Sequence, residues 1–466
     1  MSSSHRICVL SFVLLMVYAA AAGAQDRAPA QDEVAQLRAE VASLRAELDA
    51  LKRLVIDHSG TRRVGDLGPS VAEDVSLAEP NADTRVQPPP QTDPRVDILQ
   101  AQVAELAQSK VESTSKFPVK VFGTVHAHAF ANSGVPNWLD VPNIVQPVPA
   151  DGKRGTFSAA ARQTRIGLAA DGPTIGGAGT SGVVAFDFFG GVPGFQTGQV
   201  MPLPRLLVGF ARIETDRVAL QAGQDHVILA PRDPSSLAAF SFPLLFRSGN
   251  LYLRAPQARV EAVVAPHVRL TTGITAPIGG DLVGEDYRFV PPALGGERSR
   301  HPAFQAHLGV ASSDAPDALR RVALGVSGHY GRERRADGLH ESWAGAIDFA
   351  ARYERIGIAG ELFSGDNMDA FGGASGLDAR AAGGWAELQL FPFTRLSAAA
   401  GGGIDRLRGV AASIARRRNR SLFGNVKYSL TPELDAGFEY SWLGTLPGTG
   451  DERRNHHFDW VLIFRF

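Results

Sequence analysis

Cysteine is almost absent from this chain of 466 residues, because Cys8 is its only one. Cys8 lies inside a segment that we expect to be removed, so the mature chain would carry no thiol. Disulfides, cysteine-ligated metals and cysteine nucleophiles are therefore excluded. His126 and His128 would share one face of a strand, but no third ligand lies in register with them. We expect neither a metal nor a cofactor.

Long apolar runs and an excess of charge are also missing. After the N-terminus no apolar run reaches the roughly 18 residues that a membrane-spanning helix needs, which argues against a helical membrane protein. Lysine and arginine total 47, aspartate and glutamate total 48, and the formal net charge is -1. Bulk nucleic-acid binding would require a basic excess. With 44% hydrophobic residues the chain still has enough material for a large folded unit.

Residues 1–24 have the three parts of a secretory signal peptide. His5 and Arg6 form the basic end, the apolar region runs from residue 7 to 22, and Ala22-Gly23-Ala24 is a cleavage site. A membrane anchor is the alternative, but the stretch is short and small residues follow it. We expect an exported protein.

Residues 25–58 carry a heptad repeat, which predicts a coiled coil. The apolar seam consists of Val34, Leu37, Val41, Leu44, Leu48, Leu51 and Val55. Charged residues flank it, so that Glu40 can meet Arg45 of a parallel neighbour. The alternative is a single amphipathic helix packed on its own domain. The pattern favours self-association and leaves two or three strands open.

A linker and a second short helical segment are expected next. Residues 59–95 are rich in proline and glycine with few large apolar side chains, which is typical of a partly extended linker. Within 96–116, Val96, Leu99, Val103 and Leu106 again have heptad spacing. This segment is too short to associate alone.

From residue 117 to 466 the sequence alternates between apolar and polar residues in short segments separated by glycine, proline and aspartate. Val322, Leu324 and Val326, for example, alternate with Arg321 and Ser327. About 17 segments qualify; merging 250–256 with 259–265 gives about 16 antiparallel strands. Short connections such as 392–394 alternate with long ones such as 131–156 and 277–302. This pattern predicts a transmembrane β-barrel with an aqueous channel. A soluble β-sandwich or adhesin is the alternative.

The last eleven residues are expected to be a lipid-facing strand. One parity is apolar and aromatic, the other carries His457, Asp459 and Arg465. The terminal Phe466 with apolar residues at every second position before it resembles the C-terminal signature of outer-membrane proteins. We assign the barrel-assembly signal to Trp460, Leu462, Phe464 and Phe466.

Several motifs of the barrel segment occur together and are the most distinctive part of it. They are Arg165-Ile166-Gly167, Ala185-Phe186-Asp187, Leu203-Pro204-Arg205, Gly223-Gln224 and Arg254-Ala255-Pro256-Gln257. This set resembles the DcaP-like porin family, and the resemblance covers nearly the whole mature chain. It implies an N-terminal coiled coil followed by a trimeric barrel of about 16 strands, and therefore a homotrimer.

Charged residues of the segment 201–262, together with Arg165 and Asp187 before it, are the candidate pore lining. The connection formed by residues 226–249 is unusually long for a hairpin loop. The family resemblance implies that it folds into the lumen. The alternative is that it packs over the barrel mouth or at a subunit interface. Arginine outnumbers acidic residues here, which favours small anions such as carboxylates; the alternative is a lumen of paired charges with little selectivity. The candidate pore-lining and constriction residues are Arg165, Asp187, Arg205, Asp225, Arg232, Arg247, Arg254, Arg259 and Glu261.

The sequence thus favours a porin of a Gram-negative outer membrane, with its coiled coil in the periplasm. Small anionic or polar solutes would pass through it, and lipid and lipopolysaccharide would surround it. Arg416, Arg417, Arg418 and Arg420 would lie at the extracellular rim, where they could bind lipopolysaccharide phosphates or form an ordinary basic loop. No enzyme active site is recognisable. The alternatives are a structural tether or an adhesin anchored by the barrel.

Overall fold

The computed structural model describes residues 118–191, 202–278, 293–315, 318–373, 378–408 and 416–466. The expected signal peptide, coiled-coil seam, linker and second helical segment lie outside the described residues. Within those ranges, no helix has both the length and the apolar character needed to cross a membrane.

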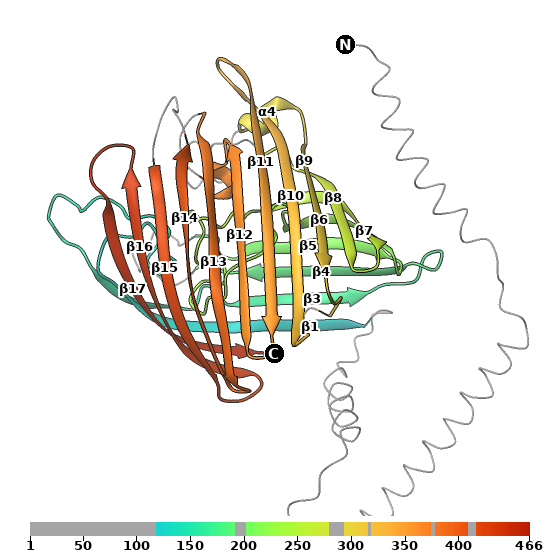
Figure 1. Cartoon of the computed structure of the whole chain (residues 1–466), viewed down its shortest axis with the longest axis horizontal. Coiled ribbons are helices and arrows are strands. Elements are labelled where there is room, and N and C mark those ends of the chain that lie inside the picture. The colour runs from blue at the N-terminus through green and yellow to red at the C-terminus, as the bar shows by residue number, and fades with distance from the viewer. Residues whose placement is uncertain (1–117, 192–201, 279–292, 316–317, 374–377, 409–415) are drawn as a thin grey trace, which may run out of the picture. The chain divides into compact units, whose positions relative to one another are not determined.

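The described residues form one antiparallel sheet (Figure 1). Its strands are β1 (Val119–Asn132), β2 (Thr156–Ala160), β3 (Arg165–Asp171), β4 (Gly179–Asp187), β5 (Arg205–Glu214), β6 (Val218–His226), β7 (Arg254–Ala265), β8 (Val268–Thr275), β9 (Ala303–Ala311), β10 (Arg320–Arg335), β11 (Gly338–Tyr353), β12 (Ile356–Asp366), β13 (Arg380–Phe393), β14 (Leu396–Arg408), β15 (Arg416–Ser429), β16 (Leu434–Pro447) and β17 (Arg453–Arg465). A short helix α4 (Gly295–Ser299) and a 3-10 turn η1 (Asp369–Phe371) lie in two connections.

The sheet closes on itself, because β1 pairs with β17 as well as with the strands that follow it. Residues 119–124 of β1 pair with β3, whereas residues 128–132 pair with β2. β2 and β3 are therefore two parts of one spanning strand, broken at 161–164. The result is a closed barrel of 16 antiparallel strands. This confirms the predicted barrel and strand number and excludes the β-sandwich.

The two ends of the barrel differ in their connections. At one end, which we call the short-turn end, most strands are joined by tight turns such as 215–217, 266–267 and 354–355. At the other, the long-loop end, lie 133–155, 188–204, 227–253, 276–302 and 367–379. One connection at the long-loop end departs from this: only Ala336 and Asp337 join β10 to β11.

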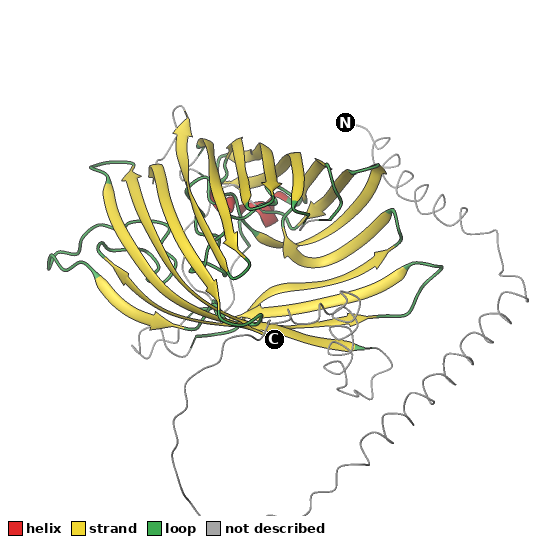
Figure 2. Ribbon diagram, turned by 60° about the horizontal axis from the view of Figure 1, so that its bottom comes forward, coloured by secondary structure: helices red, strands yellow, loops and turns green. Residues whose placement is uncertain are grey.

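Apolar side chains face outward and polar side chains face the interior, the reverse of a soluble protein. On β17, Trp460, Leu462 and Phe464 are 44–49% exposed, whereas Asp459 is fully buried. Phe458 and Phe466 share the outward parity. The alternation predicted for the C-terminal strand is therefore correct. The interior is not empty, since loops and η1 lie within the ring of strands (Figure 2).

Candidate functional site

The connection between β6 and β7, residues 227–253, lies inside the barrel; we call it the inner loop. Its first residues are held by β9 and β10, two and three strands beyond β7 in the barrel wall. The backbone N–H groups of Ile228 and Leu229 donate to Gln305 Oε1 on β9 at 2.8 and 3.1 Å. The N–H of Ala230 donates to Ser327 Oγ on β10 at 3.2 Å. The segment that the sequence marked as 226–249 thus enters the lumen.

Three buried glutamates hold the middle of the inner loop. Glu361 on β12 accepts from the N–H of Arg232 at 2.7 Å. Glu387 on β13 accepts from the N–H of Ser235 at 2.7 Å, and Glu439 on β16 does the same for residue 237 at 2.8 Å. The glutamates are at most 4% exposed. These carboxyl groups accept hydrogen bonds from backbone N–H groups and do not face open solvent.

Residues 238–241 of the inner loop are fixed at the break between β2 and β3. Gln163, which lies in that break and is fully buried, accepts from the N–H groups of Phe240 and Ser241 at 2.6 and 3.1 Å. Its side-chain amide donates to the carbonyl of Ala238 at 2.5 Å. Farther on, the side-chain amide of Asn419 donates to Ser248 Oγ at 3.0 Å. The inner loop is therefore anchored at both ends and in the middle.

Apolar side chains of the inner loop pack inside the barrel and not over its mouth. Leu229 and Leu251 lie in one cluster with Phe371 of η1. Leu245 lies in a second cluster with Trp385 of β13. Each fully buried leucine contributes about 1.5–3 kcal/mol relative to an exposed one. This packing, together with the anchors, makes the inner loop a fixed part of the lumen.

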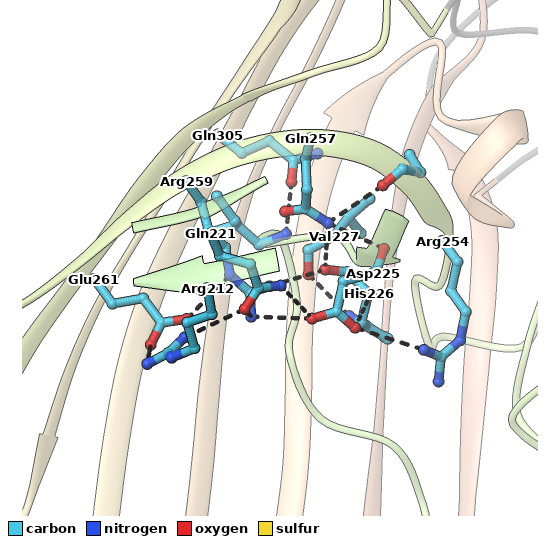
Figure 3. A network of polar contacts seen from close by, with 12 residues as sticks. Arg212, Gln221, Asp225, His226, Val227, Arg254, Gln257, Arg259, Glu261 and Gln305 are labelled. Carbon is cyan, nitrogen blue, oxygen red and sulfur yellow. Dashed lines mark hydrogen bonds and ion pairs between the residues drawn. The ribbon is translucent and has the colours of Figure 1, made fainter. Parts of the chain in front are cut away.

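A charged network lines the wall formed by β5, β6 and β7 (Figure 3). Arg259 bonds Asp225 and Glu261, each at 3.0 Å. Arg212 lies 2.9 Å from Glu261, and Arg254 lies 3.7 Å from Asp225. Arg212 also bonds Glu214 at 2.7 Å, so three arginines share three carboxylates and the formal charges of this network balance.

The wall continues toward β3 with Arg205 and Arg165, two arginines beside one carboxylate, Asp187, which gives the wall its positive excess. Arg205 forms a paired contact with Asp187 at 2.6 Å and lies over the ring of Phe242 at 4.9 Å. Arg165 is the cross-strand partner of Asp187, and its guanidinium lies 5.8 Å from the ring centre of Phe240. Within the described residues, Arg165 Nε has no hydrogen-bond partner.

Exposure distinguishes this wall from the glutamates under the inner loop. The side chains of Arg205, Arg254 and Arg259 are 27%, 20% and 16% exposed, and those of Asp225 and Glu261 are 17% and 15% exposed. The glutamates under the inner loop are nearly inaccessible, as given above. Solvent in the lumen therefore meets the arginines of this wall together with their carboxylate partners, while the carboxylates under the inner loop are covered.

Most of the predicted pore-lining residues lie together, but not all are accessible. Arg165, Asp187, Arg205, Asp225, Arg254, Arg259 and Glu261 belong to the wall just described. Arg232 is on the inner loop, with its side chain 25% exposed and 2.6 Å from Asp348. Arg247 is only 7% exposed and has a positive φ of 64°. Its role is therefore to support the inner loop, because solvent scarcely reaches it.

Several residues of the site escaped sequence analysis. Arg162 bonds Asp140 in a buried pair, and Glu361 and Glu439 anchor the inner loop. No local pattern distinguishes these from other inward residues, because their partners are far away in sequence. His126 Nε2 donates to the carbonyl of Leu237 at 2.7 Å. No group of three metal-ligating side chains occurs in the described part of the chain.

Solved structures of outer-membrane channels share this architecture. The outer membrane channel DcaP of Acinetobacter baumannii matches with a TM-score of 0.61 and 14% identity, covering 76% of this chain and 99% of that one. An anion-selective porin from Comamonas acidovorans matches with a TM-score of 0.52 and 10% identity, covering 75% and 100%. No family model and no curated protein matches the sequence. The chain has the fold of a DcaP-like porin, as its motifs predicted.

Proposed function

We propose that this chain is an outer-membrane porin whose water-filled lumen admits small hydrophilic solutes and prefers anions. One observation carries the proposal: arginines of β5–β7 are partly exposed in the lumen, while the facing glutamates are covered by the inner loop. The outward apolar surface suits a lipid environment. The long-loop end would then be extracellular and the short-turn end periplasmic, as in other outer-membrane barrels.

The preference for anions follows from the charge that a solute would meet. Fixed charges along a pore raise the local concentration of ions of opposite sign. Guanidinium groups suit carboxylates, and those of Arg205 and Arg259 are partly exposed to the lumen beside their carboxylate partners. Carboxylates are therefore the proposed solute class. The comparable porin from Comamonas acidovorans is described as anion-selective, which is consistent with this choice.

The experiment is a planar-bilayer recording on the purified full-length chain. We expect stepwise single-channel conductance and, under a KCl gradient, a reversal potential of the sign set by chloride. The double change Arg205→Gln/Arg259→Gln should move that potential toward the potassium value. Arg320→Gln, an outward position at the short-turn end with its side chain 66% exposed, is the matched control and should change nothing. Clear cation selectivity of the unaltered chain would overturn the anion proposal.

A conducting protein also separates the porin from the alternative of a structural tether or adhesin, because an anchor need not conduct. Absence of any conductance, in protein that migrates as a folded heat-modifiable barrel, would favour the tether. The inner loop then would act as a plug.

We also propose that three copies associate, with the apolar seam of residues 34–55 forming a periplasmic coiled coil. The heptad spacing of the sequence supports this assembly.

A further inference from the structure

Five arginines gather on the outer face of the barrel, at the long-loop end of neighbouring strands. They are Arg380 on β13, Arg406 and Arg408 on β14, and Arg418 and Arg420 on β15. We call them the outer arginine patch. Lower on β13 and β14 the same parity carries outward apolar residues such as Leu388 and Ile404. The patch therefore interrupts a surface that is otherwise apolar.

The strand register places like charges directly opposite each other. Arg380 is the cross-strand partner of Arg408, and Arg406 is the partner of Arg418. Like charges in such positions destabilise a sheet. Two carboxylates of the described residues oppose the patch: Asp366 lies 3.3 Å from Arg380, and Glu452 lies within 3.2 Å of Arg418 and Arg420.

Arg406 and Arg408 form no ion pair with any residue in the described ranges. Neither side chain can turn to the interior, since both share the outward parity of the exposed Ile404. An external anion would neutralise them and relieve the repulsion across the strands.

A groove between β12, β13 and β14 adjoins these two arginines. Its volume is about 790 Å³. Its lining includes the small residues Ala382 and Gly384 and the exposed apolar side chains of Leu362 and Ile404. Arg380, Arg406 and Arg408 line it as well. One groove thus offers apolar surface for a hydrocarbon chain next to a site for an anion.

Aromatic residues mark the depth of the patch. The Arg420 guanidinium lies 5.0 Å from the ring centre of Trp442. Trp343 is the cross-strand partner of Asp366, which in turn is the partner of Arg380. Tryptophans of membrane barrels concentrate where hydrocarbon meets headgroups. The patch therefore lies at the level of lipid phosphates.

We propose that this groove binds a lipid with a phosphorylated headgroup, of the kind found in the outer leaflet. Its phosphate is held by Arg406 and Arg408, whose planar guanidinium groups suit phosphate oxygens. Its acyl chain lies along Leu362 and Ile404. This inference rests on the proposed orientation of the barrel, with the long-loop end outside.

The test measures lipid binding by the purified full-length protein in detergent, with bis-phosphorylated lipid A as the probe and native mass spectrometry as the readout. Each arginine near an anionic lipid contributes about a factor of five in affinity, so Arg406→Gln/Arg408→Gln should weaken binding about 30-fold. Arg320→Gln/Arg332→Gln removes two other arginines of outward parity outside the groove and should leave binding unchanged.

Three further arms decide the chemistry. Fully dephosphorylated lipid A should bind as weakly to the unaltered protein as lipid A binds to the double variant. Inorganic phosphate should not displace the lipid. Equal binding of the dephosphorylated lipid, displacement by inorganic phosphate, or unchanged binding by the double variant would each overturn the proposal. A changed oligomeric state of the double variant would also overturn it, by marking the patch as a subunit contact.

Conductance recordings on the same preparations keep this test separate from the porin proposal. Both double variants should form channels like the unaltered protein. A failure of all three proteins to conduct would count against the porin function. The lipid-binding result would then be judged separately, from the mass spectra.

Discussion

Glu439 and Leu237 are separated by 202 positions in the chain, yet the Glu439 carboxylate accepts the Leu237 N–H at 2.8 Å. The same carboxylate accepts from Ser236 Oγ at 2.8 Å and from the Asn425 amide at 3.0 Å. Strand β16 thus holds the middle of a loop that starts on the far side of the barrel.

Replacing Glu439 with alanine should release this part of the inner loop. The N–H of Leu237 and the hydroxyl of Ser236 would lose a buried acceptor, which costs about 1–3 kcal/mol for each group. We expect a lower unfolding midpoint in urea and a larger, noisier single-channel conductance. Glu433→Ala is the control, because Glu433 is exposed in a tight turn. A variant with unaltered conductance noise would contradict the anchoring role.

Changes at Asp225 and Arg259 should move ion selectivity in opposite directions. Asp225→Asn removes the carboxylate that Arg254 and Arg259 share, so the reversal potential should move toward the chloride value. Arg259→Gln should move it toward the potassium value. Both can be measured in the same KCl gradient. A shift of the same sign in both variants would mean that the network does not set selectivity.

Gly123 is required where the barrel closes. Its N–H donates to the Phe466 carbonyl at 2.9 Å, and an added Cβ would lie 2.3 Å from the Phe466 ring and 2.7 Å from the Arg165 carbonyl. Gly123→Val should therefore reduce the yield of folded, heat-modifiable barrel severalfold. Gly345→Val is the control, since nothing lies within 4 Å of a Cβ there. Equal yields from both variants would argue against a closure role for Gly123.

The Glu452 carboxyl at the long-loop end should make stability depend on pH. Hydrogen bonds from Arg420 and then from Arg418 hold the pKa of Glu452 below its usual value. Its stabilising effect is therefore complete above the pKa of an unfolded glutamate, and it is lost as the pH falls through the lower folded value. Glu452→Gln should destabilise the barrel by at most about 1 kcal/mol at pH 7. The difference should vanish in strong acid, as measured by thermal unfolding.

The apolar seam of residues 34–55 gives a prediction for assembly. Leu37→Asp/Leu44→Asp places charge at two seam positions and should lower the trimer fraction in light scattering of detergent-purified protein. Leu37→Ile/Leu44→Ile keeps the seam apolar and is the matched control. A trimer fraction equal in both variants would assign association to the barrel alone.

Alternation of apolar and polar residues could be interpreted from the sequence because it depends only on the two-residue period of a strand. It gave the outward face of β17 and the number of spanning strands. The break at 161–164 was not predicted, because its reason is remote: Gln163 there meets the inner loop. The glutamates that anchor the inner loop could not be identified from the sequence for the same reason, because their partners are far away in the chain.

In the arginine cluster 416–420, the alternation of strand residues does not predict correctly which side chains face outward. Arg416 and Arg418 are two positions apart and should face the same side. A bulge between them breaks the register with β16. Arg416 is consequently buried, 3.3 Å from Asp405, while Arg418 faces outward. The rim cluster predicted from sequence is therefore divided between the two faces.

The position of the inner loop has a consequence for folding kinetics. Its anchors come from strands β9 to β16, which follow it in the chain, and from the break beside β1. The anchors on β9 to β16 exist only once the later strands have joined the ring, so the segment cannot take its final position before the wall is nearly complete. Its docking is therefore a late step of folding, and a slow refolding phase should report it.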